Sequence, residues 1–137
     1  MGILSWLFGG QSRRPFLQGD ECYDFEIVGE SNYQDELEKI VGARTEEGCE
    51  HYCQALLVPE PANRYDPNAV YVSIDGLKVG YLSREDAPLY RQQLAQQGVR
   101  GPALCDAMIV GGWKRRNSIG SFGVKLDLEW PIRLRMA

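Results

Sequence analysis

Apolar and polar side chains alternate along much of the chain with a period of two, the pattern of a β-strand that is buried on one face. The alternation is strictest at residues 122–130, where every second side chain is apolar. Asp75-Gly76, the strongest short-range signal for a tight hairpin, separates two other alternating stretches. The pattern predicts six strands, at residues 22–28, 50–58, 69–74, 77–82, 103–110 and 122–130.

Two further stretches have the spacing of amphipathic helices. Residues 33–41 form the first, and either Ser31 or Asn32 can cap its N-terminal end. Residues 83–98 form the second, with Asp86 expected at the N-cap because a proline two residues later is tolerated only in a first turn. Six strands and two short helices predict a mainly β fold, either a small barrel or a sandwich.

The length and composition fit one folded domain. The chain has 137 residues, of which 44% are hydrophobic and 25% are charged, an ordinary globular composition. We expect the domain to cover residues 21–137, after a flexible tail and linker at residues 1–20. Residues 1–14 combine apolar side chains with two arginines, which suits contact with a membrane surface or a partner protein. The apolar run is too short to span a membrane.

The charges are unevenly distributed along the chain. A net charge of −4 argues against a protein that coats nucleic acid indiscriminately, because such proteins need a basic surface to displace counterions from phosphates. Residues 1–60 hold 4 Lys and Arg against 12 Asp and Glu, whereas residues 61–137 hold 11 against 7. We therefore expect any phosphate-binding face to come from the second half of the chain.

A basic segment in the second half is a candidate for that face. Lys114, Arg115 and Arg116 follow Trp113 in a glycine-rich loop. Three adjacent cations can neutralise phosphates, and an aromatic ring beside them can stack on a base. A solvated hairpin tip is the alternative, since exposed loops are often charged. The residues that can extend this basic patch are Arg64, Arg84 and Arg91.

The four cysteines come without a secretory signal, so we expect reduced thiols and a cytoplasmic location. Cys49, His51 and Cys53 are weak candidates for zinc ligands. In a strand the two cysteines lie about 13 Å apart, and zinc bonds of about 2.0 to 2.3 Å cannot join them without a sharp bend. We therefore expect no cofactor, with zinc as the alternative.

A dense turn segment at residues 63–68 precedes the predicted hairpin. Asn63, Tyr65, Asp66 and Asn68 place an aromatic ring, a carboxylate and two amides in one loop, and loops on a rigid scaffold often carry function. The alternative is structural, because Asn and Asp side chains commonly bond their own backbone in turns.

The chain resembles the HIRAN domain family over roughly residues 22–130. The middle part of the resemblance is specific, because residue order, spacing and type agree over more than twenty positions. The runs that carry it are Phe25–Glu30 with Tyr33, Glu60–Val70, and Val79–Ser83 with Ala87 and Tyr90. The resemblance implies an OB-like barrel of six strands with two short helices.

The resemblance also implies binding of single-stranded DNA and, in some members, capture of a free 3′ end in a pocket. By position, Asn63, Tyr65 and Asp66 match the pocket loop. Tyr81 matches a strand position that faces this loop, and Tyr33 falls in the strand-to-helix loop across from it. An ionised Asp66 only accepts hydrogen bonds, so it can bind a terminal hydroxyl and repel a terminal phosphate. The tyrosines can stack on bases.

One stretch departs from the end-binding members of the family. In those members the loop after the first strand tends to supply an arginine and an aromatic residue, whereas this chain has Glu30-Ser31-Asn32-Tyr33. The charge at Glu30 has the opposite sign. Tyr33 can replace the stacking partner only if the loop shifts its register.

These observations favour a binding module without a catalytic motif of its own. We expect it to bind single-stranded DNA or DNA ends beside a helicase or nuclease in DNA repair, replication or processing. The first alternative is a protein- or membrane-interaction module that uses residues 1–14. The second is a hydrolase acting on nucleic acid or nucleotides. A metal-dependent hydrolase needs converging carboxylates, whereas those of this chain are scattered, at Asp66, Asp75, Asp86 and Asp106.

Overall fold

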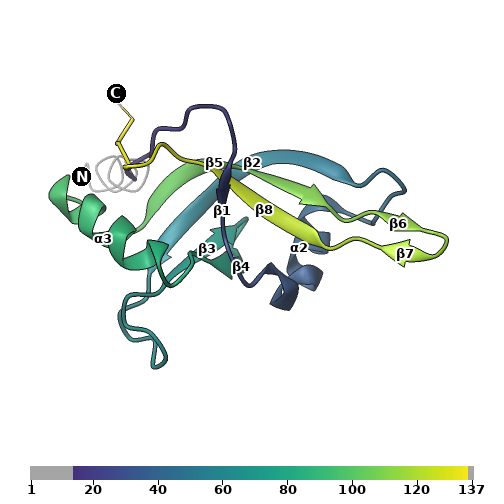
Figure 1. The fold of residues 1–137 in the computed structure, drawn as a ribbon, viewed down its shortest axis with the longest axis horizontal. Coiled ribbons are helices and arrows are strands. Elements are labelled where there is room, and N and C mark those ends of the chain that lie inside the picture. Colours follow the sequence, from purple (N-terminus) through teal and green to yellow (C-terminus); the bar gives the residue numbers. More distant parts are fainter. Residues whose placement is uncertain (1–13, 136–137) are drawn as a thin grey trace, which may run out of the picture.

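The computed structural model describes residues 14–135 (Figure 1). Strands dominate this part of the chain, and two α-helices and a short 3-10 helix accompany them. The elements are β1 (Phe25–Glu26), η1 (Glu30–Asn32), α2 (Gln34–Val41), β2 (Cys49–Pro59), β3 (Val70–Ile74), β4 (Leu77–Tyr81), α3 (Asp86–Gln96), β5 (Ala103–Gly111), β6 (Lys114–Arg115), β7 (Ser118–Ile119) and β8 (Phe122–Asp127).

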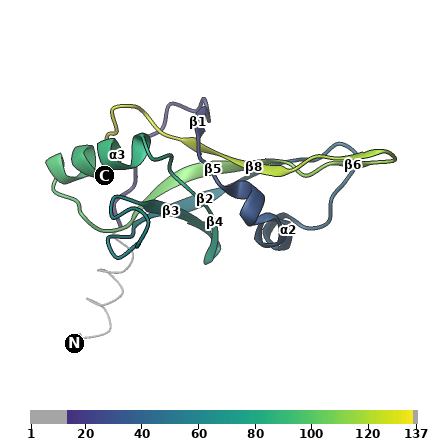
Figure 2. The same ribbon diagram turned by 60° about the horizontal axis from the view of Figure 1, so that its bottom comes forward.

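Six of the strands form one antiparallel sheet in the order β1-β8-β5-β2-β3-β4, and β6 and β7 form a separate hairpin. The sheet curls into a half-barrel (Figures 1 and 2). Its two outer strands meet where Val28, just after β1, exchanges two backbone hydrogen bonds of 2.8 and 2.9 Å with Tyr81 at the end of β4. The predicted mainly β, OB-like fold with six strands and two short helices is confirmed.

The approach of β4 to the chain after β1 depends on a glycine. A Cβ atom added at Gly80 would lie 2.8 Å from the carbonyl oxygen of Val28 and 2.8 Å from the Cδ1 atom of Ile27. Both distances are shorter than real Cβ contacts allow. Gly80 therefore permits the two outer strands to come close enough to pair.

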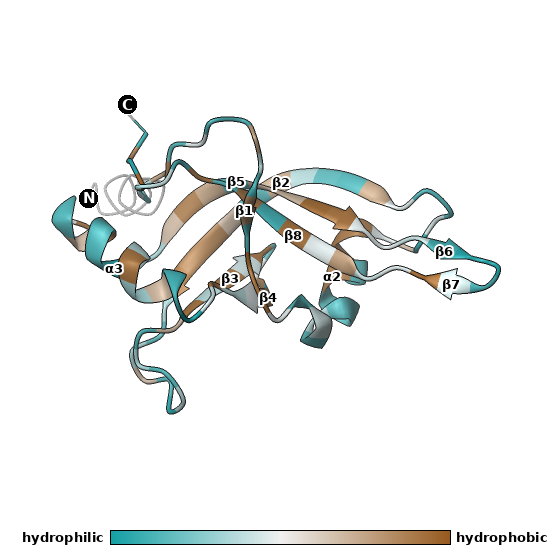
Figure 3. Cartoon of the chain, in the orientation of Figure 1, coloured by the Kyte–Doolittle hydropathy of each residue, from teal (hydrophilic) through white to brown (hydrophobic). Residues whose placement is uncertain are grey.

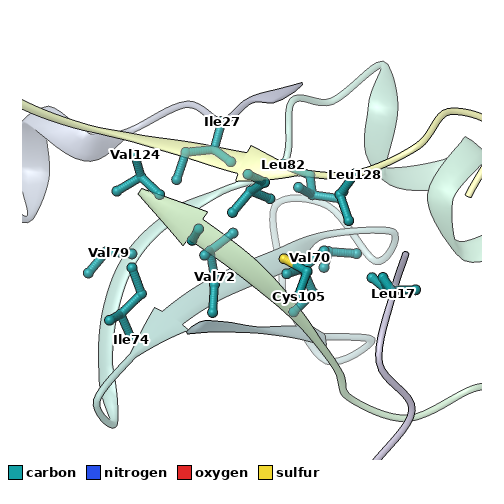
Figure 4. Close-up of a cluster of buried hydrophobic side chains, with 14 of the residues drawn as sticks. Leu17, Ile27, Val70, Val72, Ile74, Val79, Leu82, Cys105, Val124 and Leu128 are labelled. Atoms are coloured by element: carbon teal, nitrogen blue, oxygen red, sulfur yellow. The ribbon is translucent and has the colours of Figure 1, made fainter. Parts of the chain in front are cut away.

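The core lies inside the curl of the sheet, where side chains from β3, β5 and β8 point toward one another (Figure 4). From Ala103 to Ile109 every second residue of β5 is buried, as are Val70, Val72 and Ile74 of β3, so the alternation in the sequence separates the inner face of the sheet from the outer face. Figure 3 shows the hydropathy of the residues along these strands. Burial of each Val, Leu or Ile side chain contributes about 1.5 to 3 kcal/mol. Tyr90 of α3 and Leu37 of α2 are fully buried, so each helix is fixed to this core.

Local chemistry explains where several elements begin and end. Asp75 and Gly76 have φ values of 52° and 79°, the left-handed pair that a tight hairpin turn requires. The first strand is shorter than predicted, because Tyr23 has a φ of 51° and interrupts the extended backbone. The last strand ends at Asp127, three residues before the predicted end.

The helix caps differ from those predicted. Ser31 and Asn32 lie in η1 and do not cap α2, whose N-cap residue is Tyr33. Asp86 is the first residue of α3, and its backbone N–H donates to the hydroxyl of Ser83 at 3.0 Å. None of the helices in residues 14–135 is long and apolar enough to cross a membrane.

The structure differs from the linker expected up to residue 20. Leu17 is fully buried, and its backbone N–H donates to the carbonyl of Leu104 at 2.7 Å. The backbone N–H of Gln18 likewise donates to the carbonyl of Arg133, which lies near the other end of the chain. Residues 15–18 are therefore part of the folded unit, whereas the apolar tail at residues 1–13 lies outside the described range.

We predict that Gly80→Ala lowers the free energy of unfolding by about 1 to 3 kcal/mol, the usual cost of inserting a methyl group where there is no space. Denaturant unfolding measures the change. The matched control is Gly101→Ala, because Gly101 has open space around its Cα atom. This control should leave stability unchanged or slightly higher. Equal stability of the two variants would show that the pairing of the outer strands does not require a glycine at residue 80.

Candidate nucleic-acid interface

The loop that joins β2 to β3, residues 60–68, is held by its own side chains. The Oδ1 atom of Asn63 accepts hydrogen bonds from the backbone N–H groups of Tyr65 (2.9 Å) and Asp66 (3.0 Å). The Oδ1 atom of Asp66 accepts one from the N–H of Asn68 at 2.9 Å. The side-chain carbonyl of Asn63 is therefore occupied within the loop, and we assign Asn63 a positioning role.

A charged cluster fixes the start of this loop against β4. The Nδ2 atom of Asn63 donates to Glu60 Oε1 at 2.7 Å, and the hydroxyl of Tyr81 donates to the same oxygen at 3.0 Å. Lys78 donates to Glu60 Oε2 at 3.2 Å and to the Tyr81 hydroxyl at 3.0 Å. Its ammonium group also lies 4.5 Å from the centre of the Tyr71 ring. This cluster holds the loop and the Tyr81 ring in one arrangement.

The pKa values of the cluster agree with an ionised pair. Partial burial acts to raise the pKa of Glu60, but the hydrogen bonds from Asn63, Tyr81 and Lys78 outweigh it, and the pKa lies below its ordinary value. The hydrogen bond to Tyr81 is the main cause that raises the pKa of Lys78. Both groups are therefore charged at neutral pH, and the contact between them persists there.

A cleft of about 320 Å³ lies between this loop and the start of the segment that follows β4. The Tyr65 side chain at its rim is 80% exposed, and Val28 is 47% exposed. The cleft thus combines an apolar wall with an aromatic ring, a carboxylate and a guanidinium group. Its lining residues are Val28, Asn63, Tyr65, Asp66, Ala69, Tyr81, Leu82 and Arg84.

A second hollow of about 440 Å³ is lined by Glu60, Ala62, Asn63, Arg64, Tyr65 and Tyr81. It shares three residues, Asn63, Tyr65 and Tyr81, with the first cleft. The two tyrosines therefore line both spaces. Such rings can stack on bases without regard to sequence, because every base has a π-face.

Two arginines from the α3 side support the loop backbone. Arg84 donates to the carbonyl of Tyr65 at 3.3 Å, and Arg91 donates to the carbonyl of Pro67 at 2.7 Å. Arg84 also lines the first cleft, whereas Arg64 lines the second hollow. The prediction that Arg64, Arg84 and Arg91 extend the basic patch at residues 114–116 is therefore wrong, because they lie around this loop.

Tyr33 occupies a different place. It is half-buried between η1 and α2 and is not among the residues that line either space. The structure thus brings together four of the predicted loop and strand residues and leaves this tyrosine to one side.

The basic segment forms the hairpin β6–β7, with Lys114, Arg115 and Arg116 exposed near its tip. The guanidinium group of Arg115 lies 4.5 Å from the centre of the Trp113 ring, and its Nε atom donates to the carbonyl of Glu46 at 3.2 Å. Part of the predicted stacking surface of Trp113 is therefore covered by Arg115. The hairpin projects from the end of the molecule opposite the loop at residues 60–68 (Figures 1 and 2).

The three candidate zinc ligands occupy alternate positions of β2. Cys49, His51 and Cys53 are half-buried on one face of the strand. Burial raises the pKa of Cys53 to about 11, so the free thiol is protonated at neutral pH. Among residues 14–135 no group of three His, Cys, Asp or Glu side chains is placed to hold a metal ion.

Sequence reasoning missed Lys78 and the apolar wall formed by Val28 and Leu82. Strict alternation would place Lys78 and Tyr81 on opposite faces of β4. The register between β3 and β4 shifts between Val72 and Ser73, and such a bulge moves side chains to a new direction. No pattern in the sequence predicts this shift in register.

Comparison with known proteins identifies the family. The model of the HIRAN domain matches residues 21–110, a range that contains the loop at residues 60–68, the cleft and all of β4. Searches of curated proteins and of solved structures gave no match. The match spans more than half of the chain and includes the residues that carried the resemblance in the sequence. The chain therefore belongs to the HIRAN domain family.

Proposed function

We propose that this chain binds single-stranded DNA in the cleft beside the loop at residues 60–68. The observation that carries the proposal is the convergence of the exposed Tyr65 ring, the Asp66 carboxylate and the Arg84 guanidinium on one cleft. Members of the HIRAN family generally bind nucleic acid, and these three groups offer a stacking surface, a hydrogen-bond acceptor and a phosphate-binding cation.

Each group has a distinct task in this proposal. Stacking of a base on Tyr65 contributes about 1 to 3 kcal/mol. Arg84 neutralises a phosphate and releases its counterions. Asp66 keeps one oxygen in the turn with Asn68, and its second oxygen accepts a hydrogen bond from a terminal 3′ hydroxyl. A terminal phosphate would be repelled by the same carboxylate.

The proposed binding is indifferent to base sequence. Reading a base edge requires free donors and acceptors, whereas the side-chain carbonyl of Asn63 already accepts two backbone hydrogen bonds. The cleft instead offers a ring face and charges. We assign the chemistry to a partner enzyme, a helicase or nuclease in DNA repair, replication or processing, because the groups of the cleft serve binding and orientation.

We predict that the protein prefers a strand ending in a 3′ hydroxyl to one ending in a 3′ phosphate, and that Asp66→Asn removes the preference. The expected ratio of dissociation constants is about tenfold, equal to about 1.4 kcal/mol. Asparagine keeps an oxygen for the turn with Asn68 but carries no charge. Fluorescence anisotropy with two labelled oligonucleotides measures both constants.

The control for this experiment is Asp35→Asn, which makes the same charge change on the exposed side of α2. It should keep the preference for the hydroxyl end. If the unmodified protein bound both ends equally, the assignment of Asp66 to the terminal hydroxyl would be wrong. If it bound neither at low salt, the proposal as a whole would fail.

We predict further that the length of the strand determines which cations contribute to binding. A strand of about six nucleotides, within the size range of small single-strand sites, occupies the cleft and does not reach the β6–β7 hairpin at the opposite end. With this strand, Arg84→Ala should make the negative slope of the logarithm of the binding constant against the logarithm of the salt concentration shallower by about 0.7. Arg116→Ala should leave the slope unchanged until longer strands are used.

Titrations at several salt concentrations with short and long oligonucleotides test this prediction. Equal effects of Arg84→Ala and Arg116→Ala on the short strand would contradict it, because they would place the main phosphate contacts at the hairpin. Thermal unfolding of Arg84→Ala checks that loss of its bond to the Tyr65 carbonyl leaves the protein folded.

A further inference from the structure

Within residues 14–135, part of one edge of β2 has no partner strand. β2 pairs with β5 along nine residues, from Cys49 to Leu57. On its other side it pairs with β3 only from Leu56 to Pro59. Residues 50–54 therefore form a free edge in the part of the chain that the structure describes. In Figure 1 this part of β2 runs along the upper margin of the sheet.

The hydrogen bonds at the other end of β2 show which residues direct their backbone N–H and C=O groups to this edge. The N–H of Glu60 donates to the carbonyl of Ala69 at 2.9 Å, on the β3 side. Successive residues of a strand direct their N–H and C=O groups to alternate sides. Glu50, Tyr52 and Gln54 therefore present these groups to the free edge, and within residues 14–135 none of them has a backbone hydrogen bond outside the strand ladder.

The edge carries few of the features that normally prevent pairing with another strand. Such features include proline, bulges and several inward or outward charges. Residues 50–54 contain no proline, and their register with β5 has no shift. The one charged side chain with its backbone at the edge is Glu50, and the central Tyr52 is 62% exposed. The edge is thus open and regular.

We propose that this edge pairs with the same edge of a second copy of the chain. The two β2 strands run antiparallel about a twofold axis at Tyr52, and the two sheets join into one. Each copy supplies the N–H and C=O groups of Glu50, Tyr52 and Gln54 to its partner. An interface of this kind is isologous, so it closes as a dimer and does not extend into a fibre.

The self-complementary register supports a second copy as the occupant. With the axis at Tyr52, the two tyrosines face each other and each Glu50 faces a Gln54. Aromatic pairs and pairs without like charges are favourable between neighbouring strands. An axis at Glu50 would oppose two carboxylates. An axis at Gln54 would require Leu56, which already pairs with Ser73 of β3.

The proposed interface does not include the loop at residues 60–68. The free edge lies in the first half of β2, whereas the loop at residues 60–68 follows its last residue, Pro59. The proposed pairing therefore does not depend on the proposed function. A dimer has two clefts and can also hold two DNA ends, which would increase avidity without any new contact.

Charge variants at the axis test the proposal. Sedimentation velocity over a range of protein concentrations measures self-association. Tyr52→Lys and Tyr52→Glu should each weaken it at least tenfold, because equal charges meet at the axis. An equimolar mixture of the two variants should associate again, because opposite charges then meet. The matched controls are Leu89→Lys and Leu89→Glu on α3, where Leu89 is also exposed, and these should dimerise like the unmodified protein.

Three results would overturn the proposal. The first is that the unmodified protein stays monomeric at every concentration up to about 1 mM, where even weak specific association would be detected. The second is that the Tyr52 variants form dimers as stable as those of the unmodified protein, and the third is that the mixture of the two variants stays monomeric. Far-UV circular dichroism of each variant establishes that the loss of association occurs in the folded protein. DNA binding by the monomeric variants separates this proposal from the proposed function, since each can fail without the other.

Discussion

The pairing of Val28 with Tyr81 is the contact on which the rest of the structure depends. It joins the two outer strands of the curled sheet through two backbone hydrogen bonds, and the absence of a side chain at Gly80 makes the approach possible. The same two residues line the cleft. The Tyr81 hydroxyl reaches Glu60 at the base of the loop at residues 60–68, so closure of the sheet also sets the geometry of the candidate site.

The positions of the charges are compatible with the proposed nucleic-acid binding by an acidic protein. The net charge of −4 disfavours nonspecific coating of DNA. Arg84 and Arg91 donate hydrogen bonds to backbone carbonyls of the loop, and Arg84 also places a positive charge at the cleft. The three cations of the β6–β7 hairpin lie at the opposite end of the molecule. Local groups rather than the overall field therefore govern the proposed binding.

The sequence predicted the features that depend on local pattern. The six strands, the Asp75-Gly76 turn and the loop at residues 60–68 follow from side-chain alternation and turn chemistry. Features set by contacts between distant segments were not predictable. The shift between β3 and β4 turns Lys78 toward Tyr81 and Glu60. The separation of the hairpin from the loop likewise depends on how the sheet curls, which no local pattern specifies.

An NMR titration tests most directly whether the curled sheet positions a DNA-binding cleft. The backbone amide signals of the protein are followed as a short single strand with a free 3′ hydroxyl is added. The account predicts the largest changes at Tyr65, Asp66 and Arg84, with small changes at the β6–β7 hairpin. Changes confined to the hairpin, with the signals of the loop at residues 60–68 unmoved, would contradict it.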